Sequence, residues 1–282
     1  MIELTELNEL NNSQVPSIEL KRIDQEISRL LSQYTKNNSP SLEQIWEMMD
    51  SVWDEMGCDN QNFDIDKINQ FYQHPVWTLN GLFIEQDEPS LQNRQSICDW
   101  IKQHDDNIKT IIDCGAGMAV LAKLLATSLP DLSIDLYEPY PSQIVVARLS
   151  AYTNIQFVNK LNDNLYDCLI STDVLEHVPD PLSFLSEMIN QVKPHGYLII
   201  ANCFYPVIKC HLPCTFHLRY TFNIFTYLMG LKKLNILNGH IHIYQKNKTI
   251  ISNWVLIRLL EKISNVLYRF LEVVRIIYHQ IK

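Results

Sequence analysis

The central part of the chain alternates short apolar runs with segments whose apolar residues recur every three or four positions. The apolar runs predict strands at 109–113, 133–137, 155–158, 166–171 and 196–202. The segments between them predict helices at 120–128, 141–152 and 181–191. This alternation is typical of βαβ units, so we expect an α/β protein with a mostly parallel sheet and helices on both faces.

The two ends of the chain follow different patterns. Residues 1–94 predict helices only, one beginning after Ser41 and another broken near His74-Pro75. After the last predicted strand, Asn238-Gly239 predicts a hairpin, and the final ~33 residues predict one or two long helices with a wide apolar face. We therefore divide the chain into a helical lid (1–94), a core (95–249) with an insert (204–230), and a helical C-terminal extension (250–282).

The charge of the chain changes sign along its length. The net charge is −9, but residues 1–94 carry 17 acids and 6 bases, whereas residues 205–282 carry 2 acids and 11 bases. An acidic layer packing near a basic one is the simpler interpretation. The alternative is that the basic end meets an anionic surface or substrate. A nucleic-acid partner is not expected for a chain this acidic.

Cysteine usage and the N-terminus give an expected compartment. The seven cysteines form no paired framework, and the first residues are acidic rather than a basic leader. No run of ~18 apolar residues predicts a membrane-spanning helix. We therefore expect a reduced, cytoplasmic protein.

The stretch IIDCGAGMAVLA (111–122) predicts a strand, a glycine turn and a helix. It is an imperfect dinucleotide fingerprint because Val120 stands where a third glycine is required, and no G-K-[ST] of a phosphate-binding loop follows. Glu138 ends the next predicted strand, 23 residues after Gly115. An acid at that position can bind both hydroxyls of a ribose.

Two further pieces follow in order: LYDCLISTDVLEHVPDP (165–181) and INQVKPHGYLIIAN (189–202). With the glycine loop and Glu138 they resemble the class I S-adenosylmethionine-dependent methyltransferases, in particular the small-molecule branch that carries D-x-x-E-H-x-x-D-P. The resemblance covers roughly residues 95–204. It implies a Rossmann-like, seven-stranded, mostly parallel sheet and S-adenosyl-L-methionine as cofactor.

The resemblance also implies which residues bind the cofactor. Asp113, Gly115 and Gly117 would face its methionine part, with Ala119 standing where many relatives keep a third glycine. The remaining expected contacts are Glu138 at the ribose, Pro139 and Tyr140 beside the adenine, a loop in Asn159–Asp163 at the adenine, and Ser171 to Asp173 under the amino group.

Histidines are the candidates for removing a proton from the methyl acceptor. His177 follows Glu176 in the D-x-x-E-H motif and is either a base or a structural residue that holds its loop. His211 and His217 lie in CHLPCTFHLRYTF (210–222), together with Arg219 and Tyr220. We expect His177, His211 and His217 to be the catalytic residues, although this segment can equally be an ordinary packed loop.

Metal binding is an alternative that we do not favour, and we expect no metal site. Cys210, Cys214, His211 and His217 offer zinc ligands at an unconvincing spacing. Asp173, Glu176 and His177 with His211 or His217 are similar to a Mg²⁺-binding set of some methyltransferases, except that the first acid is shorter.

The leading prediction is an enzyme that methylates an oxygen of a small molecule in a biosynthetic pathway. The alternatives are methylation of nitrogen or carbon, methylation of a lipid-like acceptor held at a membrane, and a non-catalytic binding subunit. We expect a small-molecule acceptor as partner, with a peripheral membrane contact or a homodimer through the C-terminal helix as a further possibility.

Overall fold

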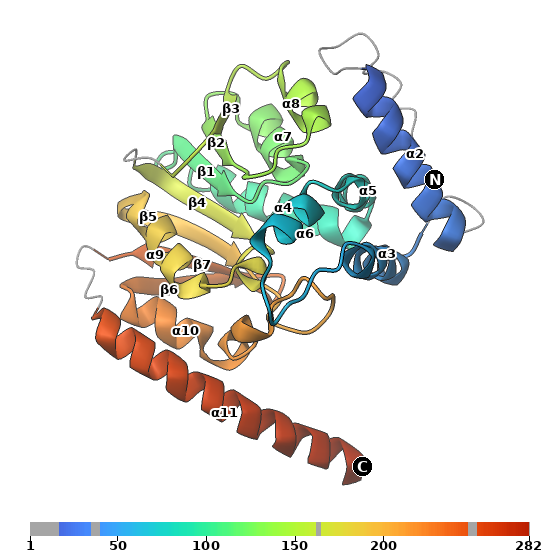
Figure 1. The fold of residues 1–282 in the computed structure, drawn as a ribbon. Helices are drawn as coiled ribbons and strands as arrows, with labels where there is room; N and C mark the ends of the chain where they lie inside the picture. Colours follow the sequence, from blue (N-terminus) through green and yellow to red (C-terminus); the bar gives the residue numbers. More distant parts are fainter. Residues whose placement is uncertain (1–16, 35–39, 162–164, 248–252, 282) are drawn as a thin grey trace. The chain divides into compact units, whose positions relative to one another are not determined.

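The computed structural model describes residues 17–34, 40–161, 165–247 and 253–281. The chain divides into two compact units, whose helices and strands are labelled in Figure 1. The first contains residues up to 160 together with 207–210, and the second contains residues 161–206 and 211–282.

The first unit carries a three-stranded parallel sheet. Its strands are β1 (Thr110–Cys114), β2 (Ser133–Tyr137) and β3 (Ile155–Val158), with β2 in the middle. They are connected through α7 (Val120–Ser128) and α8 (Gln143–Leu149), and α7 packs on β2. The expected strands at 133–137 and 155–158 and the expected helix at 120–128 are confirmed to the residue.

Five helices precede β1, as the pattern of the first 94 residues predicted. They are α2 (Ser17–Tyr34), α3 (Leu42–Glu55), α4 (Ile65–Tyr72), α5 (Pro75–Ile84) and α6 (Glu88–Lys102). Ser41 caps α3 with a capping box, and the break between α4 and α5 falls at the expected His74-Pro75. Phe71 of α4 and Val76 and Leu79 of α5 are fully buried core residues.

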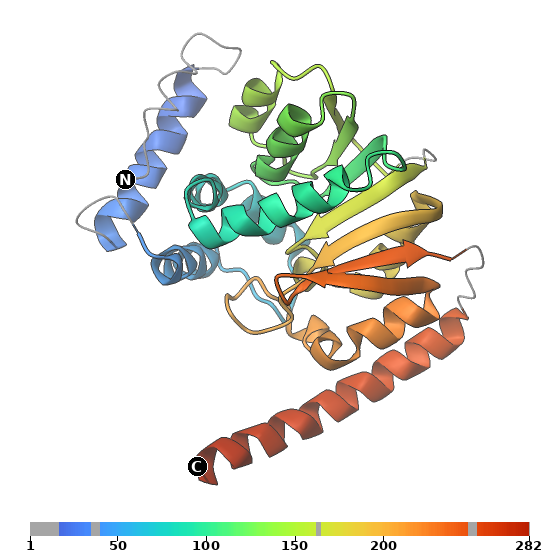
Figure 2. The same ribbon diagram turned by 180° about the vertical axis from the view of Figure 1, so that it is seen from behind.

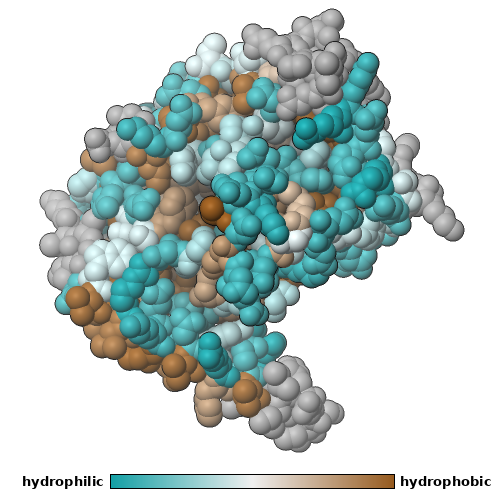
Figure 3. All heavy atoms as spheres, viewed as in Figure 1, coloured by the Kyte–Doolittle hydropathy of each residue, from teal (hydrophilic) through white to brown (hydrophobic). Residues whose placement is uncertain are grey.

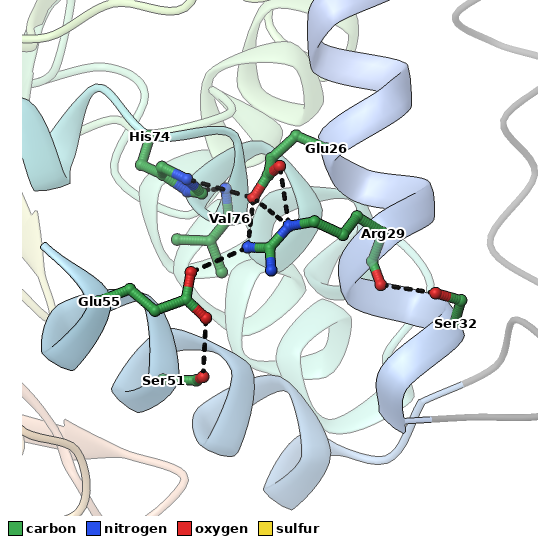
Figure 4. A network of polar contacts seen from close by, with 7 residues as sticks. All are labelled: Glu26, Arg29, Ser32, Ser51, Glu55, His74 and Val76. Atoms are coloured by element: carbon green, nitrogen blue, oxygen red, sulfur yellow. Dashed lines mark hydrogen bonds and ion pairs between the residues drawn. The ribbon is translucent and has the colours of Figure 1, made fainter.

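A polar network joins three of these helices (Figure 4). His74 Nδ1 accepts the N–H of Val76 at the start of α5, and its Nε2 lies 3.4 Å from Glu26 Oε1 on α2. Arg29 of α2 bridges Glu26 at 2.7 Å and Glu55 of α3 at 3.1 Å. Burial lowers the pKa of His74. A neutral ring is also what the two contacts require, because Nδ1 accepts while Nε2–H donates.

The second unit carries a mixed four-stranded sheet, shown from behind in Figure 2. β4 (Tyr166–Thr172) and β5 (Val192–Ala201) are parallel, whereas β7 (Ile241–Lys246) is antiparallel to both β5 and β6 (Leu231–Leu237). Asn238 and Gly239 between β6 and β7 both have positive φ, as a tight hairpin turn requires, which confirms the predicted hairpin.

The helices of the second unit are α9 (Pro181–Asn190), α10 (Leu218–Leu228) and α11 (Trp254–Ile281), with short 3₁₀ turns η2 (Leu175–His177) and η3 (Pro213–Thr215). α9 packs on β5, α10 on β6, and α11 on α10. The C-terminal segment is thus a single long helix. No helix among the described residues has the length and apolarity needed to cross a membrane.

The seven strands have the order β3-β2-β1-β4-β5-β7-β6. This order differs from the doubly wound order 3-2-1-4-5-6 by the antiparallel β7 next to β5. The expected seven-stranded, mostly parallel α/β fold is confirmed. β5 begins at Val192 rather than at 196, because Val192 pairs with Tyr166. The register then shifts at a bulge, and His195 has φ 65°. The division of the chain at residues 94 and 249 stays a prediction.

Candidate functional site

The glycine loop between β1 and α7 is a chain of left-handed residues. Gly115, Gly117 and Ala119 have φ values of 79°, 51° and 54°. The Gly115 N–H donates to the carbonyl of Tyr137 at the end of β2, and the Ala119 N–H donates to Ala116. Ala119 therefore holds a backbone conformation that glycine adopts without strain.

The N-terminus of α7 faces out of this loop without a side-chain cap. Ala119 is the residue before the helix, and it has no side chain able to bond the first helical N–H groups. The partial positive charge of a helix N-terminus favours oxygen acceptors. Within the described part of the chain, a Cβ built on Gly117 would meet nothing within 4 Å, so the loop leaves space next to these amides.

Glu138 follows β2 and lies beside the glycine loop. Its Oε2 accepts the N–H of Gly117 at 3.0 Å, and its Oε1 accepts the N–H of Tyr140 at 3.2 Å. Burial raises the pKa of Glu138, while the two N–H donors lower it. The carboxylate is therefore oriented by main-chain donors on both oxygens, with further lone pairs able to accept bonds from hydroxyl groups.

Asp113 on β1 is a buried acid behind the loop. Only 4% of the residue is exposed, and burial raises its pKa to about 7. The positive charge of Arg94 on α6 lowers this pKa, and Glu138 raises it. A carboxyl group with a pKa this close to neutral pH loses its proton readily when a cation binds nearby.

Two contacts near Glu138 had no signal in the sequence pattern. The Tyr140 hydroxyl donates to Asn69 Oδ1, and the Tyr140 ring stacks on Tyr72 with centroids 5.9 Å apart. Both partners lie on α4, so an N-terminal helix holds the segment after Glu138. The neighbouring Pro139 is exposed. The second expected adenine loop, Asn159–Asp163, includes residues 162–163, which lie outside the described part of the chain.

In the second unit, β4 ends in a polar loop. Ser171 is fully buried, and its hydroxyl has no hydrogen-bond partner among the described residues. Asp173 has φ 55°, and its N–H donates to the carbonyl of Ala201 at the end of β5. An aspartate in the left-handed region is uncommon and marks a constrained position.

Glu176 is the most deeply buried acid of this unit. Its Oε1 accepts the N–H of Cys203 at 2.7 Å, whereas its buried Oε2 has no partner among the described residues. Burial, followed by the charge of Asp173, raises the pKa of Glu176 to about 8. Its carbonyl accepts the N–H of Leu212, so Glu176 connects η2 with the segment that carries His211.

His177 and His211 come together in the second unit. Their rings meet edge to face with centroids 4.8 Å apart. His211 Nδ1 lies 2.7 Å from the carbonyl of Tyr205, which can only accept, so Nδ1 carries the proton and Nε2 keeps its lone pair. Burial lowers the pKa of His211, which favours this neutral form.

His217 does not belong to the His177–His211 pair. It is almost fully buried, its Nδ1 bonds the Ser264 hydroxyl on α11 at 2.8 Å, and its Nε2 has no partner among the described residues. Burial lowers its pKa to about 4. These contacts connect the start of α10 with α11, and a catalytic role for His217 stays a prediction.

One group of side chains in the described part of the chain has the spacing of a metal site. Glu176, His177 and His211 each offer a ligand atom, and these atoms lie within 4.8 Å of one another. Cys210 and Cys214 do not belong to this group, so the zinc set considered from the sequence is not assembled among the described residues. Asp173 and His217 are also not part of it.

Comparisons with known proteins show the family of this chain. The model of a methyltransferase domain matches residues 84–245. Among curated proteins, the ubiquinone biosynthesis O-methyltransferase of Rickettsia typhi is 28% identical over 46% of this chain, and that of Erwinia tasmaniensis is 30% identical over 52%. The chain spans only 56% and 64% of the lengths of these two relatives.

A solved structure of an O-methyltransferase family protein from Burkholderia thailandensis has a TM-score of 0.46 and 12% identity, covering 79% of this chain and 77% of that one. The domain match includes β1 to β6 and most of β7. The resemblance inferred from the glycine loop and Glu138 is confirmed for the family, whereas the branch with D-x-x-E-H-x-x-D-P stays a prediction. The matched residues make up more than half of the chain, which therefore belongs to the methyltransferase-domain family.

Proposed function

We propose that the protein is an S-adenosyl-L-methionine-dependent methyltransferase that methylates an oxygen atom of a small molecule. The observation that carries the proposal is the pairing of Gly117 with Glu138 at the carboxyl ends of β1 and β2, where parallel sheets bind ligands. The curated relatives are O-methyltransferases of ubiquinone biosynthesis, which supports oxygen over nitrogen or carbon as the acceptor atom.

The residues present fit this cofactor. Glu138 offers carboxylate lone pairs to the ribose hydroxyls, and the space beside Gly117 admits a ligand against the loop amides. Asp113, Gly115 and Gly117 would hold the methionine part, with Asp113 taking up charge opposite its ammonium group. Pro139 at the adenine, and Ser171 and Asp173 at the amino group, complete the proposed set.

When bound, the cofactor supplies a methyl group on a sulfonium sulfur, which is a good leaving group. The protein then has to position the acceptor and take its proton. His211 is the proposed base, because Tyr205 fixes the tautomer that leaves Nε2 free to accept the proton of an acceptor hydroxyl. His177 packs against that ring and positions it.

The same cluster supports a second role. A divalent cation held by Glu176, His177 and His211 would bind acceptor oxygens and lower the pKa of a hydroxyl, so that no histidine base is needed. Metal analysis of protein dialysed against micromolar Zn²⁺, Mn²⁺ or Mg²⁺ separates the two roles. Stoichiometric metal in the wild type that is lost in His211→Ala supports the cation.

The first test is calorimetric titration of S-adenosylhomocysteine and of NAD⁺. We expect the wild type to bind S-adenosylhomocysteine alone, with at least tenfold weaker binding in Glu138→Ala and Glu138→Gln. Glu187→Gln, an exposed acid on α9, is the matched control and should bind normally. Binding of NAD⁺ overturns the proposal, because the glycine loop would then hold a dinucleotide. Binding of neither ligand also overturns it and favours a non-catalytic subunit.

The second test measures transfer of labelled methyl from S-adenosyl-L-methionine to a panel of hydroxyl, amine and carbon acceptors. Preference for hydroxyl acceptors supports O-methylation, and preference for amines overturns it.

A lipid-like acceptor and a cytoplasmic location also stay proposals. So does contact of the C-terminal helix with a membrane or a second copy.

A further inference from the structure

The apolar face of α11 points away from the unit on which the helix packs. The side turned to the unit contains Ile257 and Ser264, both of which are buried. The opposite side carries Val255, Leu259, Ile263, Val266, Phe270 and Val273, which are all exposed. Their spacing of three or four residues places them in one stripe along the helix.

This exposed stripe is continuous over the described side chains of the helix. Val255, Val266 and Phe270 are 81%, 69% and 66% exposed. Leu256, Leu267 and Leu271 widen it on one side, and brown apolar residues accordingly line the edge of the molecule over α11 in Figure 3. Apolar patches this long are rare on free surfaces of single proteins and mark interaction sites.

Contacts with α9 and α10 hold α11 in an orientation that leaves its apolar stripe exposed. Ser264 bonds both His217 and Thr221 of α10, at 2.8 and 2.7 Å. Arg258 pairs with Asp180 at the start of α9, and Arg219 of α10 pairs with Glu272. These contacts fix the rotation of α11 about its axis, so the apolar stripe cannot turn inward without breaking them.

Basic side chains border the stripe. Lys262 and Arg269 are exposed and lie seven residues apart on one flank of it, next to Arg258. The two acids of α11 are already occupied, because Glu261 pairs with Arg258 at 2.8 Å and Glu272 pairs with Arg219 and Arg275. The exposed edge of the helix therefore presents apolar residues beside positive charge.

We propose that α11 docks this protein onto an anionic lipid surface, lying in the plane of the interface. An amphipathic helix with aliphatic and aromatic residues beside Lys and Arg has the pattern of an interfacial anchor. Anionic headgroups would receive Lys262 and Arg269, while the acyl boundary would cover the stripe from Val255 to Val273.

Charge complementarity favours a lipid surface over a second copy of the chain. A twofold contact through the same face would bring Lys262 and Arg269 toward their own copies. Residues 205–282 hold only two acids, Glu261 and Glu272, and both are engaged in ion pairs. An anionic membrane covers the apolar stripe and supplies the missing negative charge at once.

The test is co-sedimentation of the full chain with vesicles of phosphatidylcholine and with vesicles of equal parts phosphatidylcholine and phosphatidylglycerol. We expect binding to the anionic vesicles, at least tenfold weaker binding to the neutral ones, and release by high salt. The variant V266S/F270S should lose at least tenfold in partitioning, and K262E/R269E should lose binding to the anionic vesicles.

Matched controls come from exposed residues of the first unit. L91S/V146S removes two exposed apolar side chains from α6 and α8, and K102E reverses one exposed base, so both should bind as the wild type does. Thermal melting checks that every variant is folded. The assay contains neither cofactor nor acceptor, so its outcome is independent of the proposed function.

Three outcomes overturn the inference. The first is a wild type that does not sediment with anionic vesicles, and the second is a V266S/F270S variant that binds them as well as the wild type does. The third is a dimer in light scattering that V266S/F270S converts to a monomer while vesicle binding is absent, which would assign the face to a second copy.

Discussion

The main-chain N–H of Gly117 donates to Glu138 Oε2 at 3.0 Å, which fastens the loop after β1 to the acid after β2. A ligand hydroxyl bound by Glu138 would therefore lie next to the Gly117 backbone. The open space beside Gly117 makes this relationship testable without disturbing the carboxylate itself.

The substitution Gly117→Ala should weaken S-adenosylhomocysteine binding at least tenfold. A Cβ at Gly117 meets no atom of the described residues within 4 Å, so the folded protein loses only the cost of holding alanine at φ 51°, about 1–2 kcal/mol. The ligand, in contrast, would meet the new methyl group. Calorimetric titration gives the affinity, and urea unfolding gives the change in stability.

The control for this substitution is Gly239→Ala in the hairpin turn. Gly239 also has positive φ, 79°, and the residues that the structure describes likewise place no atom within 4 Å of a built Cβ. Gly239→Ala should cost a similar free energy of unfolding and leave the affinity unchanged. Equal losses of affinity in the two variants would mean that the space beside Gly117 is not a ligand site.

Gly81→Ala should disturb the glycine loop from a distance. A Cβ on Gly81 of α5 would stand 1.8 Å from Cγ and 2.9 Å from Cβ of Met118, the residue that follows Gly117. Such overpacking costs roughly 1–3 kcal/mol, and moving Met118 should also weaken cofactor binding. Urea unfolding and titration measure both effects.

A double-mutant cycle with Met118→Ala checks the mechanism. If the clash is the cause, the double variant loses less stability than the sum of the two single losses, because the truncated side chain leaves room for the alanine. Additive losses would show that Gly81 acts through something other than Met118.

The sequence pattern predicts this site well where the signal is local. The glycine loop, Glu138 and helix 120–128 follow from apolar periodicity and from residues within one βαβ unit. Those features depend on neighbours a few positions away, which a pattern along the chain records directly.

The supporting contacts could not be predicted, because they join residues that are distant in sequence. Asn69 reaches Tyr140 across 71 positions, and Arg94 acts on Asp113 from a helix outside every motif. His211 and His217 also show the limit of spacing as evidence. They are six residues apart, but the turn between them directs His211 to Tyr205 and His217 to Ser264.

Asp113 should make stability fall as the pH rises from about 4 to about 7. Its folded-state pKa is raised to about 7 from 3.8, so in this window the folded state holds a proton that the unfolded state has released. The loss amounts to about 4 kcal/mol over the window, an order-of-magnitude figure. Because the pKa of His217 is shifted in the opposite direction, urea unfolding at pH 4 and pH 7 should show this loss as the difference between the wild type and Asp113→Asn.

Asp113→Asn removes this titration. The free energy of unfolding of the variant should therefore rise relative to that of the wild type as the pH increases over the same interval. Binding of S-adenosylhomocysteine should strengthen with pH in the wild type, because its ammonium group favours the charged carboxylate. A pH-independent difference between the two proteins would contradict the raised pKa.

His217 should make stability fall as the pH falls, which is the opposite of the effect of Asp113. Burial lowers its folded-state pKa to about 4 from 6.5, so the unfolded state binds the extra proton between these values. Stability from this group is therefore complete above pH 6.5 and lost as the pH falls toward 4, by about 3 kcal/mol. His217→Asn should flatten this part of the pH profile.

Ser264→Ala separates the structural role of His217 from a catalytic one. It removes the hydroxyl that His217 Nδ1 bonds at 2.8 Å, so the free energy of unfolding should fall by about 1–3 kcal/mol. If His217 serves only to hold α11 on α10, kcat of the folded variant stays within about twofold of the wild type. If His217 is a base oriented by Ser264, kcat falls at least tenfold while the affinity for S-adenosylhomocysteine is unchanged, and that result would support the predicted catalytic role of His217.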